Sequence, residues 1–95
     1  MKVTVEFLSL PLITRSLGKK RIDFEFNGST LADLGRALGS KISRANDILL
    51  RSDGLIDDDI QIYINGAEKI DRDESESRKL NEGDTVTFMM LVAGG

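Results

Sequence analysis

Residues 21–34 read RIDFEFNGSTLADL, and within this stretch the apolar residues change from one period to another. Ile22, Phe24 and Phe26 alternate with charged residues, as expected for a strand that buries one face. From Leu31 onward the apolar residues fall at intervals of three, four and four, which forms one stripe on a helix. That stripe consists of Leu31, Leu34, Leu38 and Ile42. The stretch therefore predicts a strand followed by an amphipathic helix.

The start of this helix carries a capping signal. Thr30 and Asp33 are placed so that a side-chain oxygen can accept from an unpaired first-turn amide, and Ser29 is the alternative cap. We expect the helix to end near Ala45 or Asn46. Its two glycines, at positions 35 and 39, each cost about 1 kcal/mol relative to alanine, so the helix must rely on tertiary packing.

Three further stretches alternate with a period of two and predict strands, at residues 3–7, 60–64 and 86–92. Asn65-Gly66 suits a tight hairpin turn into a short fifth strand within 67–70, and residues 81–84 form a turn before the last strand. We expect the polar residues 71–77 to stay in solvent. The prediction is an α+β fold, a mixed sheet of four to five strands with one main helix on one face, in a single domain over residues 1–95.

Composition excludes several classes of function. The 95 residues contain no Cys and no His, so the chain lacks the common zinc ligands and the usual nucleophile–base pairs of hydrolases. The absence of Cys fits a reducing compartment. The longest apolar run, residues 88–93, is far shorter than the ~20 residues that span a bilayer. We expect a cytoplasmic protein without a membrane segment.

Three charged or glycine-containing motifs do not predict a binding site for phosphate, nucleic acid or metal. Gly18-Lys19 resembles the end of a phosphate loop, but Ile13 stands where that motif needs glycine. The basic residues Arg15, Lys19, Lys20 and Arg21 have no interleaved aromatic residue, and the net charge is −3, so a solvated loop is favoured over nucleic-acid binding. The acidic runs at 57–59 and 71–76 lack the spacing of a calcium loop, so we expect no metal.

The last residues carry the strongest chemical signal. From Thr85 to Gly95 no side chain is charged, and the sequence ends in Ala93-Gly94-Gly95. A carboxylate becomes a good electrophile only after activation, for example by transfer to AMP. Residues without a Cβ can thread a narrow channel toward another protein's nucleotide site. The three residues 93–95 can extend about 10 Å beyond the folded domain. A frayed terminus without function is the alternative.

Four motifs in their order along the chain resemble the MoaD/ThiS family of ubiquitin-like sulfur carriers. These motifs are TLADL at 30–34, IYING at 62–66, GDTV at 83–86 and AGG at 93–95. The resemblance covers essentially the whole chain and implies the ubiquitin-like β-grasp fold with residues 93–95 as a flexible tail. Many family members have proline just before the tail, where this chain has residues 89–92 without one.

The resemblance also implies a function. In this family a ubiquitin-activating-type adenylyltransferase uses ATP and Mg²⁺ to adenylylate the terminal glycine, here Gly95. A persulfide sulfur donor enzyme then converts it to a thiocarboxylate. The chain would be a carrier and cosubstrate, not a stand-alone enzyme, and would bind no cofactor itself. Segments 9–20 and 71–79 are long beside minimal thiamine-type carriers, which favours the small subunit of molybdopterin synthase, whose large subunit receives the Gly94-Gly95 tail.

Residues next to the tail are candidates for partner binding. If Val86 and Phe88 face the helix, Met89 and Leu91 point away from it. We expect Phe88, Met89 and Leu91 to contact the partner, with simple partial exposure as the alternative. Three other functions stay open at this point. They are a ubiquitin-like modifier joined to lysines through Gly95, a carrier for thiamine thiazole synthesis, and a plain interaction domain.

Overall fold

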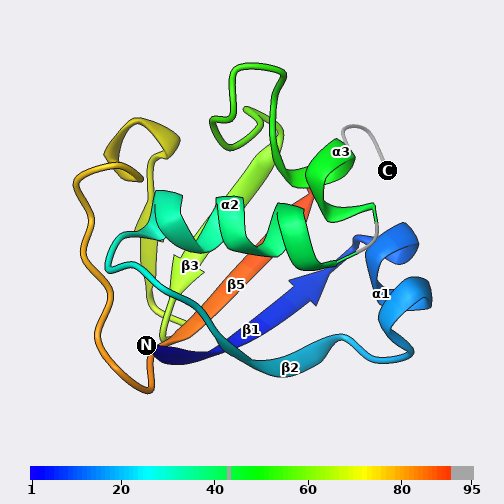
Figure 1. The fold of residues 1–95 in the computed structure, drawn as a ribbon, viewed down its shortest axis with the longest axis horizontal. Coiled ribbons are helices and arrows are strands. Elements are labelled where there is room, and N and C mark those ends of the chain that lie inside the picture. The colour runs from blue at the N-terminus through cyan, green and yellow to red at the C-terminus, as the bar shows by residue number, and fades with distance from the viewer. Residues whose placement is uncertain (43, 91–95) are drawn as a thin grey trace.

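The fold is a five-stranded mixed sheet with helices on one face, as shown by a computed structural model that describes residues 1–42 and 44–90, without the side chain of Arg72. The strands are β1 (Lys2–Leu8), β2 (Arg21–Glu25), β3 (Ile60–Ile64), β4 (Glu68–Ile70) and β5 (Thr85–Met90), in the order β2-β1-β5-β3-β4 (Figure 1). β1 and β5 are parallel, and the other neighbours are antiparallel. The predicted mixed sheet and its short fifth strand are confirmed.

Strand alternation places one set of apolar side chains under the helices. Val3, Val5 and Phe7 of β1 are at most 1% exposed, and Val86 and Phe88 of β5 are fully buried. The rings of Phe7 and Phe88 stack across the parallel pair, with their centroids 6.1 Å apart. Because β1 and β5 are central strands, their inward side chains form the middle of the core.

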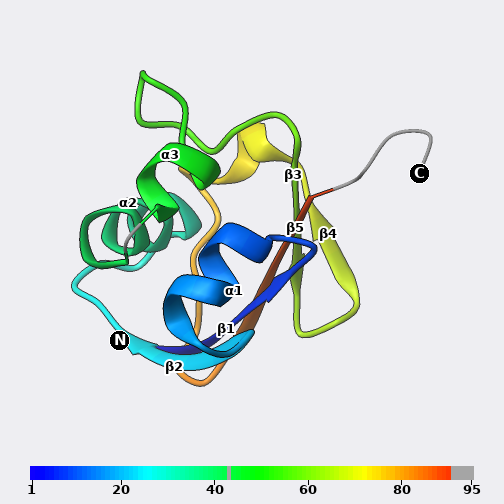
Figure 2. The ribbon, with the colours of Figure 1, turned by 90° about the vertical axis from the view of Figure 1, so that its right-hand side faces the viewer.

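Within the described residues, helices cover only one face of the sheet, as the edge-on view in Figure 2 shows. They are α1 (Pro11–Leu17), α2 (Leu31–Lys41) and α3 (Ala45–Leu49), and a short 3₁₀ helix spans Arg72–Glu74. Among the described residues, no helix has the length and apolar character needed to cross a membrane.

The expected end of the main helix was wrong. α2 ends at Lys41 instead of near Ala45, because Ile42 is extended, with φ −111° and ψ 125°. After Arg44, which has a φ of 73°, a separate helix begins as α3. α2 and α3 pack closely at Gly39, where an added Cβ would lie 2.9 Å from Leu50 Cδ1. The two short helices therefore form a corner that the hydrophobic stripe alone does not reveal.

The segment between β1 and β2, interpreted from sequence as a solvated loop, contains helix α1. Pro11 occupies its first turn, where a missing amide leaves no hydrogen bond unmade. Gly18 ends it in the left-handed conformation, with φ 77°, and donates its amide to Thr14 O at 2.8 Å. Ile13 is fully buried, so this helix is anchored to the core by its apolar side although basic residues follow it.

The start of α2 confirms the predicted cap. Thr30 Oγ1 accepts from the Asp33 amide at 3.1 Å, and the Asp33 carboxylate accepts from the amides of Ser29 and Thr30 at 3.0 and 3.1 Å. These amide hydrogen bonds, together with smaller contributions from the Thr30 hydroxyl and Arg36, hold the pKa of Asp33 below its usual value despite some desolvation. Thr30 is therefore the cap, and Ser29 supplies only an amide.

The polar loop between β4 and β5 packs against the start of α2. The first-turn amides of Leu31 and Ala32 donate to the carbonyls of Arg78 and Ser75, both at 2.9 Å. Ser75 is only 2% exposed, so the expectation that residues 71–77 remain wholly in solvent was wrong. The loop thus satisfies amides that the helix cannot pair itself.

Two turns fix the start of β5. Asn65 and Gly66 have φ angles of 54° and 72°, as the predicted hairpin turn requires. The Asn65 side chain accepts from the Thr85 amide at 2.9 Å and donates to Asp84 at 3.1 Å. The strand that leads to the C-terminal segment is therefore tied at its first residue to both turns.

Candidate functional site at the end of strand β5

β5 delivers the C-terminal segment from the centre of the sheet. Its last described residues are held from both sides, because Met89 pairs with Leu8 of β1 and Met90 pairs with Ile60 of β3. A central strand has neighbours on each edge, so its end is fixed more firmly than that of an edge strand. The predicted tail residues Ala93, Gly94 and Gly95, and the predicted contact residue Leu91, lie outside the described residues.

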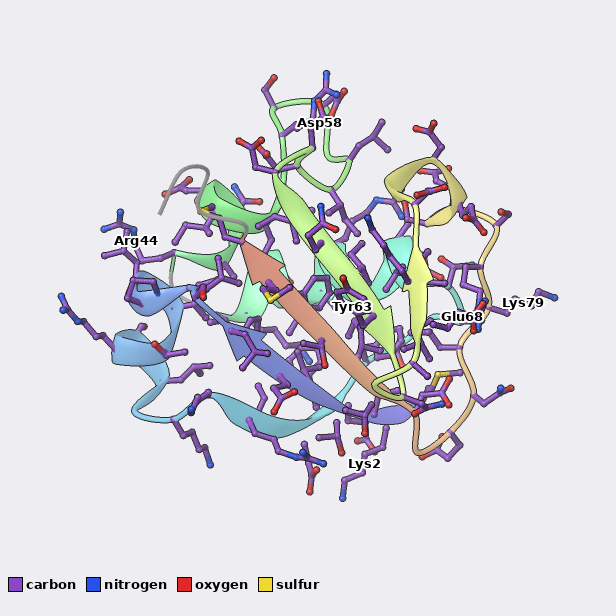
Figure 3. The ribbon with its side chains drawn as sticks, turned by 180° about the vertical axis from the view of Figure 1, so that it is seen from behind. Lys2, Arg44, Asp58, Tyr63, Glu68 and Lys79 are labelled. Atoms are coloured by element: carbon purple, nitrogen blue, oxygen red, sulfur yellow. The ribbon has the colours of Figure 1, made fainter. Side chains whose placement is uncertain are left out.

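A shallow hollow of about 280 Å³ lies on the sheet face that no helix covers. Its apolar side chains are Leu8, Tyr63 and Met89, and it is completed by Glu6, Gly66 and Thr87. Figure 3 shows this face, with Tyr63 near its middle. We call this set of residues the outer hollow. It lies directly beside the end of β5, so a protein that approached the tail from this side would meet it.

The outer hollow has one polar wall. Thr87 Oγ1 donates to Glu6 Oε1 at 3.2 Å, and Thr87 is only 6% exposed although it faces away from the helices. Glu6 Oε2 also lies 3.9 Å from Arg21 Nη1 on β2. The hollow therefore combines apolar side chains with a fixed carboxylate, which favours a partner surface of mixed polarity.

A second hollow, of about 220 Å³, lies on the helical side of the same strand end. Its lining is entirely apolar and comes from Leu10, Pro11, Leu12, Ile48 and Met90. We call it the tail-base hollow. Leu12 is 47% exposed and is the one large apolar side chain among the described residues that is exposed to this degree. These residues come from the start of α1, from α3 and from the last residue of β5.

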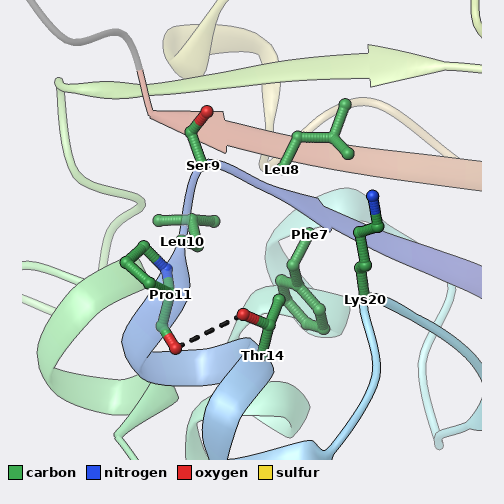
Figure 4. Close-up of a pocket in the computed structure, with 7 residues that line it drawn as sticks. All are labelled: Phe7, Leu8, Ser9, Leu10, Pro11, Thr14 and Lys20. Atoms are coloured by element: carbon green, nitrogen blue, oxygen red, sulfur yellow. Dashed lines mark hydrogen bonds between the residues drawn. The ribbon is translucent and has the colours of Figure 1, made fainter.

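A third hollow, of about 390 Å³, lies where β1 meets α1. Figure 4 shows Lys20 at its edge and the Thr14 hydroxyl donating to Pro11 O, at 3.3 Å. Lys20 is the one charged side chain in its lining. In the predicted basic cluster, Lys20 borders this third hollow, whereas Arg21 lies beside Glu6.

The predicted contact residues Phe88 and Met89 lie on opposite faces of the sheet. Phe88 is fully buried against Phe7, so the prediction that it contacts a partner was wrong, because its side chain faces the core. Met89 lies half-buried in the outer hollow, on the face away from the helices, as its parity predicts. Leu12 was missed, because its segment was interpreted as a loop. The available signal for a helix in this segment was the spacing of Leu10, Ile13 and Leu17, at intervals of three and four.

The acidic runs form no ligand cluster in the described part of the chain, where no group of three Asp or Glu side chains is placed to hold a metal ion. Asp57 accepts from the Asp59 amide at 2.9 Å, and Asp58 lies 3.9 Å from Arg51. Arg36 joins Glu76 at 2.7 Å, and Arg78 forms a bidentate pair with Glu68 that lowers the pKa of that carboxyl. These carboxylates pair with amides and arginines on the surface.

The β-grasp order of elements and the central strand that leads to the glycines are those of a known family. The family model for the ThiS family matches residues 14–95, which includes the terminal glycines. This chain belongs to the ThiS family. The residues of this chain before 14, which form β1 and the start of α1, lie outside the match. No curated protein sequence matches this ThiS-family chain significantly.

Solved structures share the fold of this ThiS-family protein over nearly its whole length. SAMP1 from Haloferax volcanii superposes with a TM-score of 0.78 at 18% identity, covering 100% of both chains. A chain of the BexX/CysO complex from Amycolatopsis orientalis gives 0.71 at 26% identity, covering 98% of this chain and 99% of that one. A protein described as molybdopterin converting factor subunit 1 from Pyrococcus furiosus gives 0.68 at 20% identity, covering 97% and 99%.

Proposed function

We propose that this protein is a sulfur carrier whose Gly95 carboxylate is adenylylated and converted to a thiocarboxylate. The observation that supports this most directly is the family match, which continues through Ala93-Gly94-Gly95. The fold adds a rigid support, because β5 is a central strand paired with β1 up to Met89 and with β3 up to Met90. The chain would act in the cytoplasm as a cosubstrate, and its partners would perform the chemistry.

The proposed chemistry has three steps. A carboxylate oxygen of Gly95 bonds to the α-phosphorus of ATP, and pyrophosphate leaves, in the active site of a ubiquitin-activating-type adenylyltransferase that uses Mg²⁺. The terminal sulfur of a donor persulfide then attacks the glycyl carbonyl carbon and displaces AMP, which gives an acyl disulfide. A second thiol attacks the donor sulfur of that disulfide and releases the glycyl thiocarboxylate. Glycine at positions 94 and 95 leaves the reacting carbon free of side-chain hindrance.

We propose molybdopterin synthase as the enzyme that uses this sulfur, with this chain as its small subunit. Two features support this branch over a thiamine-type carrier: the long segment before β2, which folds as helix α1, and the long loop between β4 and β5. The fold shared with the Pyrococcus furiosus converting-factor subunit agrees with it. The Gly94-Gly95 tail would then enter the active site of the large subunit.

The outer hollow is the proposed contact surface for these partners. Leu8, Tyr63 and Met89 offer apolar contact beside the strand end, on a face that no helix covers. Tyrosine and methionine are enriched where proteins bind each other, because they give a large contact area and adapt to the partner. Met89 therefore keeps the role that the sequence suggested, whereas Phe88 does not.

Mass spectrometry of the intact chain tests the proposal. The purified protein is incubated with an adenylyltransferase of this type, ATP, Mg²⁺ and a persulfide donor. We expect the mass to increase by the difference between sulfur and oxygen, with the change on Gly95. The matched control is the chain without Gly95, which should stay unchanged. An unchanged mass of the full chain with several such enzymes, each active on its own carrier, would contradict the proposal.

Conjugation to lysines is the second candidate function. The fold matches that of SAMP1 over 100% of both chains, and that protein's name describes a modifier. A modifier would use the same adenylylated Gly95, but an amine would displace AMP instead of sulfur. Gly-Gly remnants on lysines of cellular proteins after proteolysis, lost when Gly95 is deleted, would favour this function over sulfur delivery.

A further inference from the structure

We propose that the tail-base hollow binds an apolar side chain of the adenylyltransferase during activation of Gly95. This inference rests on the proposed function and adds a second contact site to it, on the helical side of the sheet. The hollow lies between the start of α1, helix α3 and the end of β5, and it is formed by Leu10, Pro11, Leu12, Ile48 and Met90.

The lining of this hollow is suited to an aliphatic or aromatic group. All five side chains are apolar, so nothing in the hollow would hold a charged or strongly polar ligand. Leu12 is 47% exposed, and Pro11 beside it is also exposed, so both present apolar surface to solvent. A partner side chain that covered Leu12 would remove this surface from water, which is favourable in proportion to the area.

The position of the hollow identifies the partner. Met90 forms one wall and is also the last described residue of β5. Only five residues, 91–95, separate it from the reacting carboxylate, and they extend at most about 17 Å at ~3.3 Å each. An enzyme that encloses Gly95 in a nucleotide site must therefore bring its own surface within that distance of Met90.

Strand parity makes this contact separate from the outer hollow. Met89 and Met90 are adjacent, and they line hollows on opposite faces of the sheet. A partner that surrounds the chain as it leaves the sheet meets both faces. Activation is the step common to sulfur transfer and to lysine conjugation, so the adenylyltransferase is the partner that the proposal names, whichever acceptor follows.

The test measures ATP–pyrophosphate exchange by an adenylyltransferase that activates the unmodified chain, as a function of carrier concentration. Leu12→Glu should raise KM for the carrier about tenfold with little change in kcat, because burying a leucine is worth that much in affinity. Leu12→Ala should raise KM by a smaller factor. The matched control is Asn27→Glu, which adds the same charge at an exposed position beyond β2, at the opposite end of the sheet.

Leu12→Glu should fold normally, because its side chain is exposed and a carboxylate suits the first turn of α1, which has no acidic residue. Circular dichroism checks this, and Leu12→Ala decides the matter if Leu12→Glu does not fold.

Equal KM values for Leu12→Ala, Asn27→Glu and the unmodified chain would overturn the inference while leaving the proposed function intact. If the chain's own tail occupied the hollow, Leu12→Glu would react faster. If a second copy of the chain occupied it, only the oligomeric state would change. Either result would overturn the inference. Failure of the unmodified chain to support exchange would instead contradict the proposed function, and the inference with it.

Discussion

Thr87 on β5 and Glu6 on β1 are joined by a hydrogen bond across the parallel strand pair, on the face that the helices leave uncovered. Thr87 Oγ1 donates to Glu6 Oε1 at 3.2 Å. Because 29% of the Glu6 side chain stays exposed, its carboxylate can bind water when the hydroxyl is removed. We therefore expect Thr87→Val to change the free energy of unfolding by no more than about 1 kcal/mol, measured by urea denaturation. A loss more than twice as large would show that the bond is a major support of the sheet.

Glu6 also makes the outer hollow sensitive to added negative charge. Met89→Glu would place a second carboxylate in the same hollow, so we expect slower adenylylation of Gly95, by about tenfold in kcat/KM. Met89→Leu is the matched control, since it keeps the apolar contact and should react at nearly the normal rate. Equal rates for both variants would contradict the role of the outer hollow in docking. Steady-state exchange kinetics provide the measurement.

Phe88 should affect stability and not docking. Its ring is fully buried and stacks with Phe7, so Phe88→Ala should destabilise the fold by about 3–5 kcal/mol, and Phe88→Leu by much less. Both values come from denaturant unfolding. If Phe88→Leu keeps its fold, its KM with the adenylyltransferase should match that of the unmodified chain. A raised KM in a fully folded Phe88→Leu variant would restore Phe88 as a contact residue.

The two glycines of α2 should respond in opposite directions to alanine. At Gly35 the nearest atom to an added Cβ is Ile56 Cγ1 at 3.4 Å, an ordinary contact, so the better helix propensity of alanine should stabilise by up to about 1 kcal/mol. At Gly39 the added Cβ would lie 2.9 Å from Leu50 Cδ1 and 3.2 Å from Asn46 Oδ1, so these side chains must move. We expect Gly39→Ala to lower the melting temperature and Gly35→Ala to raise it. An increase for both variants would show that helix propensity dominates at both positions, and a decrease for both would show that packing does.

The capping box should give a pH-dependent contribution to stability. The folded-state pKa of Asp33 lies below the ordinary value of 3.8, so its contribution is complete above that value and is lost as the pH falls through the folded pKa. The stability difference between the unmodified chain and Asp33→Asn should therefore shrink in acid. Thr30→Ala should instead cost about 1 kcal/mol at neutral pH through the lost cap. Urea unfolding at several pH values measures both, and a difference for Asp33→Asn that grows in acid would contradict the assignment.

Much of the fold could be predicted from short stretches of sequence. The period of two located β1, β2, β3 and β5, and the Thr30–Asp33 pair located the start of α2. The hairpin turn at Asn65-Gly66 followed from residue type, because few residues adopt a positive φ without strain. Each of these features depends on residues within about one turn or one strand of each other.

The candidate site was predictable only in part. Met89 follows from alternation along one strand, and the same alternation places Phe88 on the buried face, so its inclusion as a contact residue was wrong. Leu12 could not be connected with Met90, because they are far apart in the chain and meet only through the packing of α1 against the end of β5.

The sequence by itself determined which face of each strand is buried, where α2 begins, and that an uncharged segment ending in two glycines follows the last strand. These properties depend on local backbone sterics, capping hydrogen bonds and the alternation of side chains. Tertiary structure alone decided where α2 ends, that α3 folds against Gly39, and that two hollows lie on opposite faces of the β5 end. Those features depend on contacts between distant residues, whose close packing no local pattern encodes.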